Sequence, residues 1–207
     1  MHFDQLDGGP QYGGPIHGKR MSILYTIEEK LLKVGILLQR GSLIKAQRLL
    51  EEVLEEEPDS AVAHYYLSEI YAHSANGLRP ALYHITLAVK FDPHFADAWI
   101  QNLYIAYMLG EDTMLNDAAN KALTLQIPYA FYIYRYLGMM YERQGAYVLA
   151  EENYKLAAAK GIQAFEMDLI KKCEERIKQK MKVRDNKSTR KTVALKSRKA
   201  GNKVRNK

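Results

Sequence analysis

The chain has 207 residues, of which 47% are hydrophobic and 26% are charged, and its formal net charge is +6 at pH 7. This balance is typical of one soluble domain with a buried core. The sequence lacks an apolar run of about 18 residues, which excludes a membrane-spanning helix, and its single cysteine, Cys173, excludes an internal disulfide. We therefore expect a cytoplasmic protein in which Cys173 is a small buried or half-buried side chain.

The first segment, residues 1–21, is rich in glycine and contains two prolines, with few apolar residues. Such a segment buries too little apolar surface to offset its chain entropy, so we predict that it is disordered. It does not resemble a signal peptide, because Asp4 and Asp7 lie near its start and no apolar core follows them.

Residues 22–181 have helical periodicity. Within residues 46–54, for example, apolar residues fall at 46, 49, 50, 53 and 54, which is the stripe of an amphipathic helix. Alternating runs long enough to predict a strand are missing. We expect an all-α domain of four helical hairpins, whose second helices start near 43, 79, 112 and 147, and a closing helix near 163–181.

Three prolines divide this domain at equal intervals. Pro58, Pro93 and Pro128 are 35 residues apart in both cases. Proline lacks an N–H group and disfavours helix in the residue before it, so each one is expected to end a hairpin and to begin the next. Each of these prolines follows one copy of the same spacing of small and large apolar residues. The copies contain Gly41, Leu43, Ala46, Leu50 and Val53, then Leu67, Tyr71, Ala81, Ile85 and Ala88, then Trp99, Gly110, Leu115, Ala119 and Ala122.

The clearest copy is the fourth, in residues 137–157. Gly138 and Ala150 are small enough for two helices to approach closely, and Tyr154 fills the space beside that contact. Gly145 is expected to end the first helix, because glycine takes positive φ without steric cost. The motif residues of this copy are Leu137, Gly138, Tyr141, Gly145, Tyr147, Ala150, Tyr154 and Ala157.

Together these copies resemble the tetratricopeptide repeat (TPR), a pair of antiparallel helices of about 34 residues. The resemblance covers roughly residues 25–160. It implies a right-handed helical solenoid of about four repeats, with the closing helix as a C-terminal cap.

The resemblance also implies a binding groove on the concave side, lined by the first helix of each hairpin. Leu31 and Gly35 stand where TPRs that bind terminal carboxylates carry polar residues, so we expect an aromatic or apolar groove. The alternative is that these tyrosines pack between repeats. The helix positions that line the groove in TPRs also include Asp97, Glu142 and Arg143 in this sequence. The predicted groove residues are Tyr65, Glu69, Ile100, Tyr104, Tyr107, Met108, Tyr132, Arg135 and Met139.

Motifs of catalysis are missing from the sequence. It contains neither phosphate-binding glycine loops nor a nucleophile elbow nor the paired histidines of zinc proteases. The six histidines do not form a ligand set, and His64, where the repeat often has Trp, is expected to be a half-buried helix residue. The glutamates at 51, 52 and 55–57 form a solvated face. We predict a protein that is not an enzyme and has no cofactor or metal.

The last segment is strongly basic. Residues 178–207 contain 13 Lys or Arg and one acid, Asp185, so the rest of the chain carries a net charge of −6. We predict a disordered tail at 182–207. It is either a solubilising segment, which could dock loosely on the acidic domain, or an arm that binds RNA or DNA without base specificity, since aromatic residues are missing after Ile177. The candidate polyanion-binding residues are Lys182, Arg184, Lys187, Arg190, Lys191, Lys196, Arg198, Lys199, Lys203 and Arg205.

The sequence therefore predicts a non-enzymatic module that binds a peptide or a helix of a partner protein in the groove. One alternative is a nucleic-acid-associated protein that uses the basic tail. Another is a small TPR-type chaperone, although the long basic tail departs from that pattern. The identity of the partner and the oligomeric state stay open at this stage.

Overall fold

The structure is a computed structural model that describes the backbone of residues 16–205 and the side chains of residues 26–184. Within these residues all regular secondary structure is helical. The helices are α1 (Ile16–Gln39), α2 (Leu43–Glu56), α3 (Ala61–Ala72), α4 (Leu78–Phe91), α5 (Ala96–Leu109), α6 (Asp112–Thr124), α7 (Ala130–Arg143), α8 (Tyr147–Lys160) and α9 (Ala164–Arg205).

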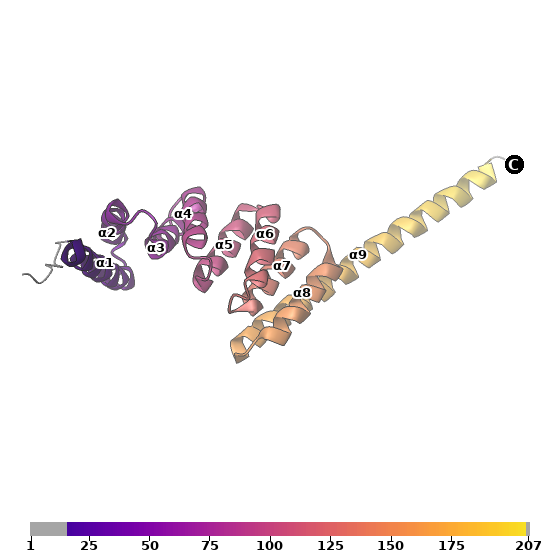
Figure 1. The fold of residues 1–207 in the computed structure, drawn as a ribbon. Helices are drawn as coiled ribbons and strands as arrows, with labels where there is room; N and C mark the ends of the chain where they lie inside the picture. The colour runs from indigo at the N-terminus through magenta and orange to yellow at the C-terminus, as the bar shows by residue number, and fades with distance from the viewer. Residues whose placement is uncertain (1–15, 206–207) are drawn as a thin grey trace, which may run out of the picture.

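The helices form a row of hairpins, in which each helix packs on the next one in the chain (Figure 1). The first helices of successive hairpins also contact one another, α3 with α5 and α5 with α7, so they form a continuous side of the array. The last helix, α9, packs on α8 and then runs on beyond the hairpins (Figure 1). The predicted all-α solenoid of four hairpins and a closing helix is confirmed.

The hairpins begin where the prolines predict. Helices α3, α5 and α7 start at Ala61, Ala96 and Ala130, two or three residues after the three prolines. In the third repeat the indole N–H of Trp99 donates to the carbonyl oxygen of Pro93 at 2.9 Å. In the second repeat Nε2 of His64 lies 3.2 Å from the carbonyl oxygen of Pro58. A ring nitrogen six residues after the proline therefore fixes the entry into both helices.

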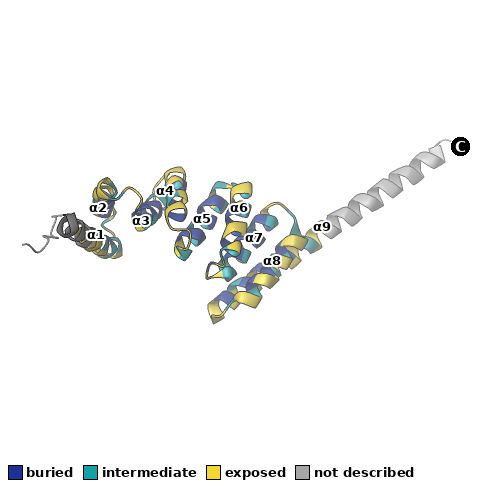
Figure 2. Ribbon diagram, in the orientation of Figure 1, coloured by how far each residue is buried: buried dark blue, intermediate teal, exposed yellow. Residues whose placement is uncertain are grey.

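The fourth hairpin shows why small residues recur in the sequence. A Cβ atom at Gly138 of α7 would lie 2.6 Å from Cε1 of Tyr154 of α8, so only glycine permits this approach. Gly145, between the two helices, has a φ of +76°, which side chains disfavour. Tyr154 is completely buried. Figure 2 shows the same pattern along the array, with buried residues where the helices face each other and exposed residues on their outer sides.

Both ends of the array differ from the sequence-based predictions. The closing helix, expected at 163–181, continues to Arg205 through the segment predicted to be a disordered tail. Lys, Arg, Gln, Met and Leu are good helix formers, and the chain contains no proline after 128 to end the helix. Similarly, α1 begins at Ile16, within the segment predicted to be disordered. Residues 1–15 lie outside the described residues.

Candidate partner-binding groove

The groove is a hollow on the side formed by the first helices, with a cavity volume of about 290 Å³. Three of the predicted residues, Tyr65, Ile100 and Tyr132, line it, one from each of three successive repeats. The sequence-based mapping also placed Asp97 in this register, but it missed two members. The lining residues are Tyr65, Asp97, Ile100, Gln101, Tyr129 and Tyr132.

Helix α5 forms the floor of the groove. Asp97, Ile100 and Gln101 are three and four residues apart, so they share one face of the helix. From α3, the Tyr65 hydroxyl donates to Glu69 at 3.0 Å, and the Tyr65 ring packs on Phe95 with 4.9 Å between centroids. These contacts hold the Tyr65 ring in place, which lowers the entropy that a bound peptide would have to remove.

Tyr129 was missed because it precedes α7 and therefore has no place in the helical register. Its φ is +70°, a left-handed conformation that is uncommon for tyrosine. Its side chain is 55% exposed, and its ring meets that of Tyr132 edge to face at 6.4 Å. The only sequence signal for this residue was an aromatic side chain directly after Pro128.

The other predicted groove residues lie outside this hollow. Tyr107 packs against the next repeat, with its ring 6.2 Å from that of Tyr136 and 4.6 Å from the guanidinium of Arg143. Arg143 also donates to the Tyr107 carbonyl oxygen at 2.6 Å. Tyr104 and Met139 are half-buried against the core. The alternative of packing between repeats therefore describes Tyr107 well.

Arg135 and Met108 complete the predicted set. The Arg135 guanidinium lies 5.5 Å from the Tyr136 ring centre, and its Nε atom is buried without a hydrogen-bond partner among the described residues. Met108 is 51% exposed. Neither side chain lines the hollow, so their place in the groove stays a prediction.

The groove presents protonated phenols. Burial, together with the negative charge of Glu69, raises the pKa of Tyr65. Burial and the nearby Glu166 raise the pKa of Tyr132. Both hydroxyls therefore keep their proton at neutral pH, and Tyr65 donates its proton in a hydrogen bond to Glu69, which leaves its oxygen as an acceptor toward the groove. The groove thus combines aromatic faces with polar atoms, and it is less apolar than the sequence suggested.

Glu142 lies at a groove register position, but it faces the opposite way. Its side chain is buried and accepts hydrogen bonds from Tyr154 at 2.8 Å, Arg176 at 2.6 Å and Lys180 at 2.7 Å. Burial by itself would raise the pKa of Glu142, but these hydrogen bonds outweigh it and lower the pKa to about 2. The carboxylate therefore joins α7, α8 and α9 as a structural centre.

The basic segment is described only in part. Among the candidate polyanion-binding residues, Lys182 and Arg184 have described side chains, and both are exposed. The Arg184 guanidinium lies 5.4 Å from the Tyr147 ring centre. The side chains of the other candidates lie outside the described part of the chain, although their backbone is helical up to 205.

The described residues contain no group of three or more His, Cys, Asp or Glu side chains that could hold a metal ion. Among the described helices, none is both long enough and apolar enough to cross a bilayer.

The chain was compared with known proteins. No family model matches it, and no curated protein matches its sequence. Solved structures do match. A crystal structure of MamA protein is 20% identical, covers 76% of this chain and 88% of its own, and has a TM-score of 0.59. A thermophilic TPR protein of Thermus thermophilus, TTC0263, is 18% identical, with coverages of 75% and 81% and a TM-score of 0.55.

Human IFIT1, solved as a dimer with PPP-AAAA, is 19% identical and has a TM-score of 0.64. The match covers 82% of this chain but only 44% of IFIT1. At these identities the likeness concerns the fold. These matches agree with the sequential helical hairpins and with the spacing of their small residues. The chain therefore has the fold of a tetratricopeptide-repeat protein.

Proposed function

We propose that the protein is a non-enzymatic interaction module that binds an extended peptide segment of a partner protein in the groove. The observation that carries the proposal is the hollow shared by three repeats, in which rings from α3 and α7 flank the polar floor of α5. TPR domains generally mediate protein–protein interactions, which agrees with this use of the groove.

The side chains of the groove indicate the chemistry of the peptide. Tyr65, Tyr129 and Tyr132 offer aromatic faces for apolar side chains, and aromatic anchors supply much of the energy at protein interfaces. The Gln101 amide can donate to and accept from a peptide backbone. Asp97 favours a hydrogen-bond donor or a positive charge at the centre. We therefore infer a peptide that combines apolar anchors with a central donor group.

Site-specific photo-cross-linking tests this proposal. A photoreactive amino acid replaces Tyr129 in the groove or, as the matched control, Val148 on α8; both side chains are 55% exposed. We expect a partner to be cross-linked from position 129 and not from 148. The purified partner is then titrated with the parent chain and with Asp97→Lys. Equal cross-linking at both positions, or undiminished affinity of Asp97→Lys, would contradict the proposal.

A second candidate function is binding of nucleic acid by α9, and the helical backbone of the basic segment favours it. Residues 187, 191, 198 and 205 are all Lys or Arg. They are spaced by four or seven residues, so their positions share one side of an α-helix. An ordered basic stripe neutralises phosphates along a duplex, and its affinity falls steeply with salt.

Two variants, each with four substitutions, test whether binding depends on one side of the helix or only on the number of positive charges. One replaces 187, 191, 198 and 205 by Gln, and the other replaces 182, 196, 199 and 203, which lie on a different side of the helix. Both remove four positive charges. We expect only the first variant to lose most of its affinity for a random-sequence DNA duplex in gel-shift titrations. Equal losses would point to an unstructured tail, and no binding by the parent chain would end this candidate.

A further inference from the structure

A hollow with a basic lining lies between the first turn of α8 and the middle of α9. Its cavity volume is about 320 Å³, which is within the range of pockets that hold small molecules. Its lining residues are all different from those of the groove. We call it the basic pocket, and its lining residues are Tyr147, Arg176, Gln179, Lys180 and Val183.

Positive charge exceeds negative charge among the described side chains of this pocket. Nε and Nη2 of Arg176 donate to the buried Glu142 at 2.6 and 2.7 Å, and Nζ of Lys180 donates to the same carboxylate at 2.7 Å. One carboxylate balances only one of these two cations. Arg184 adds a third cation beside Tyr147. The excess of positive charge favours an anionic ligand.

The cations keep donors that an incoming ligand can reach. The Arg176 side chain is 45% exposed and the Lys180 side chain is 44% exposed. Glu142 does not engage Nη1 of Arg176, and it engages only one N–H group of the Lys180 ammonium. Arg184 is exposed and donates to the Gly145 carbonyl oxygen from Nη1 alone, at 3.4 Å. The free donors suit the oxygen atoms of a phosphate group.

The pocket also has an aromatic wall. Tyr147 is half-buried, and the Arg184 guanidinium lies 5.4 Å from the centre of its ring. Unpaired nucleic-acid bases stack on aromatic rings and on guanidinium groups. The basic segment itself has no aromatic residue after Ile177. The packing of α9 on α8 supplies the ring that this segment lacks.

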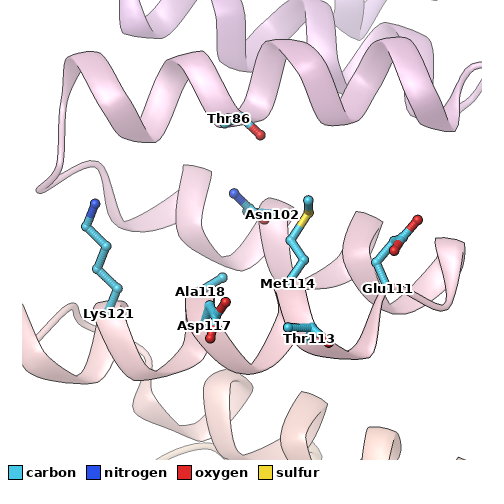
Figure 3. Close-up of a pocket in the computed structure, with 8 residues that line it drawn as sticks. All are labelled: Thr86, Asn102, Glu111, Thr113, Met114, Asp117, Ala118 and Lys121. Atoms are coloured by element: carbon cyan, nitrogen blue, oxygen red, sulfur yellow. The ribbon is translucent and has the colours of Figure 1, made fainter.

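A larger hollow, between α4 and α6, does not select a ligand of one charge. Its cavity volume is about 480 Å³. Lys121 and Glu111 stand at its opposite ends, and Asp117 adds a second carboxylate (Figure 3). Its lining therefore favours neither an anion nor a cation, in contrast to the basic pocket. We call it the outer pocket, and its lining residues are Thr86, Asn102, Glu111, Thr113, Met114, Asp117, Ala118 and Lys121.

We propose that the basic pocket binds one nucleotide of a single-stranded nucleic acid. Arg176 and Lys180 donate to its phosphate group, and its unpaired base stacks against Tyr147 and Arg184. The bases of a duplex are stacked on one another and do not reach the ring, so the pocket selects single strands. An acidic peptide would use the cations and leave the ring unused. This proposal is independent of the groove, and it concerns another site and another form of nucleic acid than the duplex candidate.

The probe is a single strand of about five thymidine nucleotides, titrated into the isotope-labelled full-length chain and followed by NMR. We expect shifts of the Tyr147 ring and of the amides of residues 176–184, with a dissociation constant on the order of millimolar or below. Two matched ligands lack the bases: an abasic strand with the same phosphates, and a glutamate peptide of the same charge. Both should bind at least about tenfold more weakly. Equal binding of either one, or no shift at Tyr147, would overturn the proposal.

Substitutions separate the ring from the charge. Tyr147→Leu should weaken binding of the strand about tenfold, whereas Tyr147→Phe keeps a ring and should keep the affinity. Arg184→Gln should weaken binding about threefold to tenfold, whereas Lys178→Gln, which removes an exposed charge from another side of α9, should change little. Thermal melting shows whether Tyr147→Leu is folded, and if it is not, the contrast between Arg184→Gln and Lys178→Gln decides. Full affinity of a folded Tyr147→Leu, or equal effects of Arg184→Gln and Lys178→Gln, would overturn the proposal.

The variant with Gln at 187, 191, 198 and 205 distinguishes the basic pocket from the stripe along α9. These four positions lie beyond the pocket, so we expect this variant to keep its affinity for the short strand whether or not the parent chain binds a duplex. If it loses the short strand, the strand binds along α9 and the pocket is not its site.

Discussion

At the scale of single residues, Glu142 shows how one buried charge can join several helices. It extends from α7 and accepts hydrogen bonds from Tyr154 on α8 and from Arg176 and Lys180 on α9. Because Arg176 and Lys180 are nearly half exposed, water screens part of this interaction. The buried carboxylate is nevertheless expected to matter, since its partners surround it.

Glu142→Gln should lower the free energy of unfolding by about 1–3 kcal/mol at neutral pH, because the amide loses charged hydrogen bonds. The pKa of Glu142 falls from 4.5 to about 2 in the folded state, so this stabilisation is present above pH 4.5 and is lost as the pH falls toward 2. Urea unfolding of parent and variant should therefore differ at neutral pH and converge in acid. Glu151→Gln, which breaks the exposed pair with Lys155, is the control and should change little.

A second residue-scale prediction concerns His64 and His84. Their Nδ1 atoms are 2.9 Å apart, so one ring donates and the other accepts, which requires a neutral acceptor. Burial lowers the pKa of both rings, and for His84, also repelled by His64, the pKa falls to about 4. Because folding lowers the pKa of these histidines, their contribution to the free energy of unfolding is fully present above about pH 6.5. It is lost as the pH falls toward 4.

Acidification through this window should lower the free energy of unfolding by about 1–2 kcal/mol, after allowance for solvent screening of the half-exposed His84. Urea unfolding across the window measures this loss, and His84→Phe should reduce it. His94→Gln, at an exposed histidine, should leave the pH dependence unchanged. If the parent chain unfolds equally readily across this range, the histidine pair has no such role.

At the scale of the elements, the array depends on how closely the two helices of each hairpin approach each other. In the fourth hairpin, Gly138 admits the ring of Tyr154, and this ring carries the hydroxyl that reaches Glu142. The close contact between α7 and α8 therefore also positions the Tyr154 hydroxyl, which donates to the carboxylate that α9 binds. The buried Ile170, Cys173 and Ile177 of α9 complete the same cluster, which fits the role of a cap.

Gly138→Ala tests this closure. The added methyl group would overlap the Tyr154 ring and should lower the free energy of unfolding by about 1–3 kcal/mol, as overpacked cores do. Gly35→Ala in α1 is the matched control, because nothing lies within 4 Å of its Cβ position. That variant should gain about 0.5–1 kcal/mol from helix propensity. Chemical unfolding of both variants measures the contrast, and equal effects would refute the steric account.

At the scale of the whole molecule, stacking of repeats creates sites that no single hairpin contains. The groove takes residues from three repeats, and the outer pocket takes them from two. Tyrosines on the same side of the array consequently have different roles. Tyr129 is largely exposed at the groove, whereas Tyr107 connects the third repeat to the fourth through Tyr136 and Arg143.

This division of roles predicts opposite effects of two substitutions. Tyr129→Asn removes a groove ring and keeps a residue that tolerates positive φ, so melting should change little. Partner affinity should fall about thirtyfold, equivalent to about 2 kcal/mol. Tyr107→Ala should instead lower the free energy of unfolding by about 1–3 kcal/mol. Melting and titration with the cross-linked partner must be measured on the same preparations, and the reverse pattern would refute the assignment.

The sequence by itself determined the features that depend on neighbours along the chain. Equally spaced prolines located the starts of α3, α5 and α7. Gly138 and Tyr154 indicated a close helix contact, because a hairpin brings residues at that separation together. The groove positions implied by the resemblance to TPRs also placed Tyr65, Ile100 and Tyr132 on one side, and the structure brings them into one hollow.

Only the tertiary structure decided which way the remaining side chains face. Glu142 has a groove register position, yet it is buried toward α9, because partners 34 and 38 residues away compensate its charge. Arg184 appears in the sequence as one basic residue among many, and only the packing of α9 on α8 places it beside the Tyr147 ring. A repeat period specifies how each helix meets its neighbours in the chain. The charge balance of a buried site depends on distant residues that the period does not contain.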